Sequence, residues 1–244
     1  MAAPLVLCYH AVSEDWPAPL SVTPTQFEQQ IRWLARRGYR GVTLTQALSG
    51  ANGRRVVAVT FDDAFRSVVE LAEPILRDHG FVATIFAPTG FVGKDQPMAW
   101  PGIDQWLGSA HEAELVPASW EELERLLAGG WEIGSHTVTH PRLTELSADQ
   151  LRTELTRSKA DCESHLGVSC ESIAYPYGDH DAAVIDAAAE AGYGFGVTLP
   201  ARFHPGRPLR WPRVGVYHRD GAWRFAAKSA SFVRGTRSLF DRGT

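Results

Sequence analysis

The chain has 244 residues, of which 44% are hydrophobic, so it is long enough to bury a sizeable core and does not have a disordered composition. No apolar run approaches the roughly 18 residues that a membrane span needs, and the first eight residues lack the basic and apolar regions of a signal peptide. We therefore expect no transmembrane span and a cytoplasmic location, with a peripheral membrane association left open.

The net charge of −4 is unevenly distributed along the chain. The segment from Leu199 onward carries +8, whereas the remainder carries −12. This pattern has two interpretations: contact with an anionic partner such as a sugar diphosphate or an acidic membrane surface, or a solvated basic helix. No nucleic-acid partner is expected.

Apolar strands and amphipathic helices alternate along the chain. Strands are predicted at 5–9, 39–44, 56–61, 81–87, 131–135, 172–175, 193–199 and 210–217, and helices at 24–37, 64–79, 119–127, 147–166, 181–191 and 221–240. This alternation is typical of a parallel sheet covered by helices. We therefore predict an α/β, barrel-like single domain over 1–244, with a core at about 5–217 and a basic C-terminal helix at 221–240. The irregular stretch 88–117 is typical of a lid or binding loop.

The predicted strand at 56–61 ends abruptly at two adjacent carboxylates, Asp62 and Asp63. Charges at the end of a buried strand indicate a site, because ligands bind at the carboxyl ends of parallel strands. The alternative is a helix N-terminus, at which Asp63 caps the next helix and Asp62 faces water. This stretch alone does not separate the two readings.

Other polar residues also follow predicted strands, so they are expected to meet at one face of a barrel. His136 and His140 form an H-x-x-x-H pair, and His10 ends the first strand. Two imidazoles and a carboxylate suit zinc or a neighbouring first-row metal, and three ligands leave positions open for catalysis. One carboxylate of the doublet would bind the metal, and the other would take a proton from metal-bound water.

Three short motifs follow strands: Thr60-Phe61-Asp62-Asp63, His136-Thr137-Val138-Thr139-His140 and Tyr175-Pro176-Tyr177-Gly178. In this order they resemble the polysaccharide deacetylases with the NodB homology domain, carbohydrate esterase family 4, over roughly 5–217. The resemblance implies a distorted (β/α) barrel of about seven parallel strands. It also implies a metal-dependent hydrolase that removes N-acetyl groups from amino sugars of a poly- or oligosaccharide or glycan intermediate.

The resemblance also implies roles for single residues. Asp62 corresponds to the catalytic base, and the backbone N–H of Tyr177 corresponds to an oxyanion donor. The implied metal ligands are Asp63, His136 and His140. Zinc is the default ion, although Co²⁺, Ni²⁺, Mn²⁺ or Fe²⁺ would fit the same ligands.

The chain departs from the commoner family pattern at several positions. Ala174 stands where the third motif usually has an arginine, and Arg213 is a candidate replacement that would orient the base. The usual C-terminal motif with the general acid is absent in clear form. A group of exopolysaccharide deacetylases has this motif on its first strand, as in Leu7-Cys8-Tyr9-His10, so we assign the acid to His10 in preference to His218.

Substrate contacts are assigned to the third motif, to nearby aromatic residues and to a C-terminal arginine. For the tryptophans, sugar stacking and simple packing are both open. The assigned residues are Pro176, Trp211, Arg213, Trp100 and Trp106. Two alternatives remain at this point: an enzyme of the same fold that cleaves a non-sugar amide or imide, and an inactive glycan-binding homologue.

Overall fold

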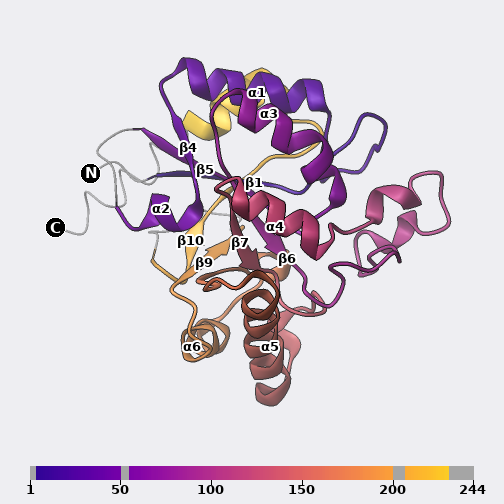
Figure 1. Ribbon diagram of the computed structural model, residues 1–244, viewed down its shortest axis with the longest axis vertical. Coiled ribbons are helices and arrows are strands. Elements are labelled where there is room, and N and C mark those ends of the chain that lie inside the picture. Colours follow the sequence, from indigo (N-terminus) through magenta and orange to yellow (C-terminus); the bar gives the residue numbers. More distant parts are fainter. Residues whose placement is uncertain (1–3, 51–54, 200–206, 231–244) are drawn as a thin grey trace.

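The computed structural model describes residues 4–50, 55–199 and 207–230, and its centre is a parallel sheet that curls into a nearly closed barrel (Figure 1). Eight strands follow one another in the order β10-β9-β8-β7-β6-β5-β1-β11, and β4 pairs with β5 besides. The bounds are β1 Leu5–Tyr9, β4 Arg40–Val42, β5 Val56–Phe61, β6 Thr84–Ala87, β7 Glu132–Ser135, β8 Ser172–Ala174, β9 Phe195–Thr198, β10 Trp211–Pro212 and β11 Val214–Gly215. The predicted α/β barrel is confirmed.

One extended stretch joins the two edges of the sheet. Its first half, β10, pairs with β9, and its second half, β11, pairs with β1. Between them, the backbone N–H of Arg213 donates to Thr198 O at 3.1 Å. When β10 and β11 are counted as one stretch, seven strands surround the interior, in agreement with the prediction. The junction places Arg213 inside the barrel with 1% of its surface exposed.

Helices surround the barrel, with α1 and α3 on one side and α5 and α6 on the opposite side (Figure 1). Four of the helices begin with a capping box, in which a Ser or Thr side chain and a Glu or Gln three residues later satisfy the first N–H groups. The helices are α1 Pro24–Arg36, α2 Leu44–Leu48, α3 Glu73–Asp78, α4 Trp120–Ala128, α5 Ala148–Leu166 and α6 Ala182–Glu190.

Several short elements complete the fold. A two-stranded parallel sheet pairs β2 (Ala11–Val12) with β3 (Ser21–Val22). The short helical turns are η1 Val68–Ala72, η2 Asp104–Trp106, η3 Glu112–Leu115, η4 Leu143–Glu145 and η5 Pro176–Gly178. Residues 222–230 are helical, as predicted for the start of the C-terminal helix, and the remainder of 221–240 lies outside the described residues.

Alternate side chains of each strand face the two sides of the sheet. On β1, Leu5, Leu7 and Tyr9 belong to the large core cluster that includes residues of α1 and α4. Val6 belongs to a separate cluster with side chains from β5, β6, β8 and β9, such as Phe86. This second cluster fills the barrel. The strands therefore carry a packed interior, and the polar residues that follow them are held at its rim.

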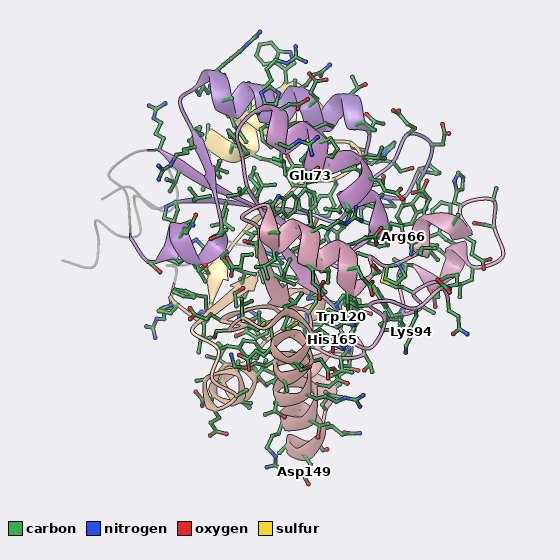
Figure 2. All side chains as sticks on the ribbon, in the orientation of Figure 1. Arg66, Glu73, Lys94, Trp120, Asp149 and His165 are labelled. Atoms are coloured by element: carbon green, nitrogen blue, oxygen red, sulfur yellow. The ribbon has the colours of Figure 1, made fainter. Side chains whose placement is uncertain are left out.

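The covering helices also contact one another. The indole of Trp120 on α4 stacks on the imidazole of His165 on α5, with ring centroids 4.1 Å apart and planes 8° apart (Figure 2).

Across the described ranges, no helix has the length and apolar character needed to cross a bilayer. The cytoplasmic location and the limits of the single domain stay predictions.

Candidate active site

Polar residues from four strand ends meet around one cavity of about 170 Å³. His10 follows β1, the two carboxylates follow β5, His136 follows β7, and Tyr177 lies in the loop after β8. The rest of the lining comes from His140, the long loop after β6, Leu20 before β3 and Leu199 after β9. The full set is His10, Leu20, Asp62, Asp63, Trp100, Pro101, Gly102, Ile103, His136, His140, Tyr177 and Leu199. The structure thus brings together the residues that the three motifs and the first strand contribute.

Asp63, His136 and His140 form a buried group at the floor of this cavity. The Nε2 atoms of His136 and His140 lie 3.4 and 3.3 Å from Asp63 Oδ1. His136 Nδ1 donates a hydrogen bond to Ala174 O at 2.7 Å, which fixes the ring and leaves Nε2 as the atom that faces Asp63. In the neutral ring this Nε2 carries a lone pair, so two electron-rich atoms face each other.

This donor set fits a divalent metal ion. Two nitrogen or oxygen ligands at about 2.1 Å from a tetrahedral ion lie about 3.4 Å apart, which matches the two measured separations. Asp63 Oδ1 is buried and has no hydrogen-bond partner among the described residues. A cation among the three side chains would satisfy this oxygen and offset the contact between electron-rich atoms.

The reading of Asp63 as a helix cap is wrong. The helical stretch after β5 begins at Arg66, and Asp63 Oδ1 accepts no hydrogen bond from it. Asp62 does not face bulk water, because only 2% of its surface is exposed. Both carboxylates therefore belong to the site.

Charges within the site are balanced locally. Burial raises the pKa of Asp63, but the adjacent imidazoles of His136 and His140 outweigh burial and hold this pKa well below its usual range. Burial lowers the pKa of His136, but Asp63 and Asp62 raise it overall. Burial also lowers the pKa of His140, and there it dominates. The carboxylate is thus ionised and favours positive charge beside it.

Asp62 makes a different set of contacts. Arg213 Nη1 donates to Asp62 Oδ1 and Nη2 to Oδ2, both at 2.7 Å, and Nη1 also donates to Thr60 Oγ1 at 3.0 Å. Burial raises the pKa of Asp62, but the Arg213 guanidinium outweighs it, so the pKa falls to about 2. Arg213 therefore makes the contact with Asp62 that is expected of a candidate replacement for the arginine absent at Ala174. The Arg213 side chain is fully buried. Its assignment to substrate contact stays a prediction.

The backbone of the site adopts left-handed conformations that side chains disfavour. Five non-glycine residues in the described ranges have positive φ: Asp63 (70°), Ala64 (49°), Thr137 (67°), His140 (59°) and Tyr177 (60°). All five lie in the loops that carry the site. Such conformations cost about 1–3 kcal/mol each and persist only where surrounding contacts impose them.

Contacts around the loop 136–140 impose its shape. Glu154 of α5 accepts hydrogen bonds from Val138 N (2.7 Å), Thr139 N (3.0 Å) and Thr139 Oγ1 (2.7 Å). On the other side, Gly90 N donates to Val138 O at 2.9 Å, and a Cβ at this glycine would lie 2.6 Å from the same oxygen. The sequence does not identify Glu154 as a site residue, because a single glutamate on an amphipathic helix belongs to no recognisable motif.

His10 lies at the cavity, whereas His218 is not among the cavity-lining residues that the structure describes. The backbone N–H of His218 donates a hydrogen bond to Pro19 O at 2.8 Å. His10 Nδ1 is buried without a hydrogen-bond partner within the described ranges. The placement supports His10 over His218 as the acid, although the role itself stays a prediction.

The assigned aromatic residues have different positions. Trp100 lines the cavity and stacks on His140, with ring centroids 4.2 Å apart, and 7% of its surface is exposed. Trp106 instead packs edge-on against Trp16 at 5.9 Å, and Trp211 belongs to β10. Neither of these, nor Pro176, is among the described residues that line the cavity. Their part in sugar binding stays a prediction.

The basic C-terminal segment uses part of its charge internally. Arg213 pairs with Asp62, and both Arg224 and Lys228 pair with Asp220. Contact with an anionic partner stays a prediction.

Comparison with known proteins agrees with this geometry. The sequence model of the polysaccharide deacetylase family matches residues 49–196, a stretch that carries both carboxylates, both histidines and the tyrosine loop. The chain belongs to the polysaccharide deacetylase family. It is 26% identical to Streptococcus pyogenes deacetylase PplD, solved with acetate, at a TM-score of 0.75 over 93% of this chain and 97% of that one.

Two further proteins are similar to this chain. IcaB from Ammonifex degensii matches with 26% identity and a TM-score of 0.76, over 94% of this chain and 97% of that one. The poly-beta-1,6-N-acetyl-D-glucosamine N-deacetylase of Staphylococcus aureus is 28% identical over 192 residues, which is 73% of this chain. The match spans 61% of the length of the staphylococcal enzyme.

Proposed function

We propose that the protein is a metal-dependent deacetylase that removes N-acetyl groups from N-acetylglucosamine-type residues of a poly- or oligosaccharide. The observation that carries this proposal is the buried Asp63–His136–His140 group, with an unpartnered carboxylate oxygen, beside Asp62 and His10 in one cavity. The name of the staphylococcal relative supports an acetylated amino sugar as the substrate.

Asp63, His136 and His140 would hold the ion, with zinc as the default choice. A divalent ion bound there would lower the pKa of a coordinated water towards about 7 and polarise the acetyl carbonyl. Three protein ligands would leave coordination positions free for water and substrate, as hydrolytic metal sites require.

Asp62 would act as the general base. It is adjacent to Asp63 in the chain and lines the same cavity. Because Arg213 holds both of its oxygens, Asp62 would stay ionised and keep a fixed orientation, in which it would accept a proton from the attacking water.

His10 would protonate the leaving amine, since it faces the cavity from β1 on the same rim. The backbone N–H of Tyr177 would donate to the oxyanion of the tetrahedral intermediate. At about 170 Å³ the cavity is smaller than typical sites for whole ligands, which supports a pocket for the acetamido group with the sugar chain outside.

Acetate release from acetylated β-1,6-linked glucosamine oligosaccharides tests the proposal. The metal-loaded protein should release acetate, and the metal-free protein should not. Parallel assays with small amides and cyclic imides separate the sugar deacetylase from an amidohydrolase of the same fold. Cleavage of small amides without acetate release from any acetylated amino sugar would refute the proposal.

A further inference from the structure

Cys8 is a buried thiol in contact with the residue assigned as the base, and the proposed reaction does not use it. Its Sγ lies 3.4 Å from Asp62 Oδ2, and it donates a weak hydrogen bond to this oxygen. Ligand atoms of Cys8, His10 and Asp62 all lie within 4.8 Å of one another. These three residues share no member with the Asp63–His136–His140 group, yet His10 and Asp62 line the same cavity as that group, with Cys8 buried behind Asp62.

The spacing of the cysteine group suits a tetrahedral ion that binds sulfur. With a metal–sulfur distance of about 2.3 Å and a metal–oxygen distance of about 2.1 Å, the two ligand atoms lie about 3.6 Å apart. The separation of Sγ and Oδ2 is 3.4 Å. His10 Nδ1, buried and without a hydrogen-bond partner in the described residues, shows that the imidazole has unused coordination capacity.

We propose that Cys8, His10 and Asp62 form a second, inhibitory metal site that takes a thiophilic divalent ion. The ion replaces the thiol proton: Cys8–SH and M²⁺ give a Cys8 thiolate–metal bond and release one proton to solvent. No oxidant or reductant takes part.

Charge decides which ions bind. Arg213 already places one positive charge on Asp62, so a purely oxygen-bound cation is repelled. The thiolate formed on binding supplies an additional negative charge and a soft ligand. This combination selects ions that bind sulfur strongly, such as Cd²⁺ or excess Zn²⁺, over hard cations such as Mg²⁺.

The functional consequence rests on the proposed function. An ion at this site occupies the base and the acid together, so it blocks both proton transfers while the Asp63–His136–His140 group stays loaded. The enzyme should therefore be activated by the first equivalent of zinc and inhibited by excess zinc.

Cadmium titration tests the site independently of catalysis. In the wild type we expect two Cd²⁺ ions per chain within the ligand groups that we describe and a sulfur-to-cadmium charge-transfer absorption in the ultraviolet. Cys8→Ser keeps a hydroxyl donor for Asp62 and should lose this second ion and its absorption. The chain has three cysteines, so the matched control is Cys162→Ala/Cys170→Ala, in which Cys8 is the sole thiol. This control should keep the Cys8 absorption.

Zinc inhibition is the second arm. At least a tenfold higher zinc concentration should be needed to inhibit Cys8→Ser than to inhibit the wild type or the double control variant. If Cys8→Ser is poorly folded, Cys8→Ala replaces it, with the same expectation. Cadmium absorption that survives in Cys8→Ser and vanishes in the control would overturn the proposal, as would equal zinc inhibition of all variants. A protein that binds the second Cd²⁺ but releases no acetate would refute the proposed function alone.

Discussion

The two ends of the barrel each hold a polar cluster around carboxylates, but they differ in how completely those groups are satisfied. At the amino ends of the strands, Glu132 accepts hydrogen bonds from Thr45 N (3.0 Å), Thr45 Oγ1 (2.9 Å), Thr84 Oγ1 (3.1 Å) and Ser172 Oγ (2.5 Å). At the carboxyl ends, Asp63 Oδ1 is buried without a hydrogen-bond partner in the described residues.

The difference separates a structural cluster from a functional one. A satisfied buried carboxylate ties together the elements that donate to it, here α2, β6 and β8 around β7. An unpartnered buried carboxylate costs free energy unless a ligand completes it. The five non-glycine residues with positive φ in the described ranges also lie at this end. The fold thus holds strained and unsatisfied groups at one rim, and the site depends on this arrangement.

The largest effect should follow from removal of a proposed metal ligand at the carboxyl ends of the strands. His136→Ala removes an imidazole that is buried and oriented by Ala174 O. We expect loss of the bound metal and of acetate release. Metal content per chain by elemental analysis measures the first effect, and His79→Ala, on a distant helix end, is the matched control. Full metal content in His136→Ala would contradict the assignment.

Asp62→Asn tests whether the two adjacent carboxylates have different tasks. The amide cannot accept the proton, so kcat should fall by about 10²–10⁴-fold while metal content stays normal. A thermal melt must accompany the assay, because Arg213 then lacks its buried counter-charge. Near-normal kcat in the folded variant would show that another group is the base.

Much of this site follows from sequence order alone. Asp62, Asp63 and His136 directly follow predicted strands, so their convergence was predictable once the strands were taken as parallel. Arg213 was predictable as a partner of Asp62 because Ala174 stands where the family pattern usually has an arginine. The pairing of β10 with β9 and of β11 with β1 places Arg213 beside Asp62. The local sequence pattern does not indicate this barrel closure.

Other features depend on three-dimensional context. Asp63 and His140 have positive φ although neither is a glycine, so the sequence does not single out these positions. Hydrogen bonds from Glu154 on α5 help to hold the loop 136–140 in this shape. Glu154 on α5 accepts a hydrogen bond from the backbone of Thr139, a loop residue 15 positions earlier in the chain. Trp100 and Trp106 lie in the same loop, yet only Trp100 reaches the cavity, since composition does not determine the direction of a side chain.

Glu154→Gln should weaken metal binding through the loop rather than through direct ligation. It replaces the carboxylate that holds Val138 and Thr139, so His140 becomes less well positioned. We expect the metal dissociation constant to rise by about 10–100-fold, as measured by competition with a chelator. Glu163→Gln on the same helix is the control. Unchanged affinity would remove Glu154 from the account.

The smallest effect on catalysis should come from the satisfied end. Glu132→Ala leaves buried hydroxyl donors without an acceptor and should lower the free energy of unfolding by about 1–3 kcal/mol. The kcat per folded, metal-loaded molecule should stay unchanged. Chemical denaturation and active-site titration measure the two quantities. A large fall in kcat at full folding would erase the distinction between the two ends.

Anomalous X-ray diffraction from crystals grown with one equivalent of zinc per chain tests the central claim most directly. The account predicts one strong anomalous peak at about 2.0–2.2 Å from an Asp63 carboxylate oxygen and the Nε2 atoms of His136 and His140, with Asp62 still bound to Arg213. A zinc ion bonded to Asp62 in place of Asp63, or no peak among these three side chains, would contradict it.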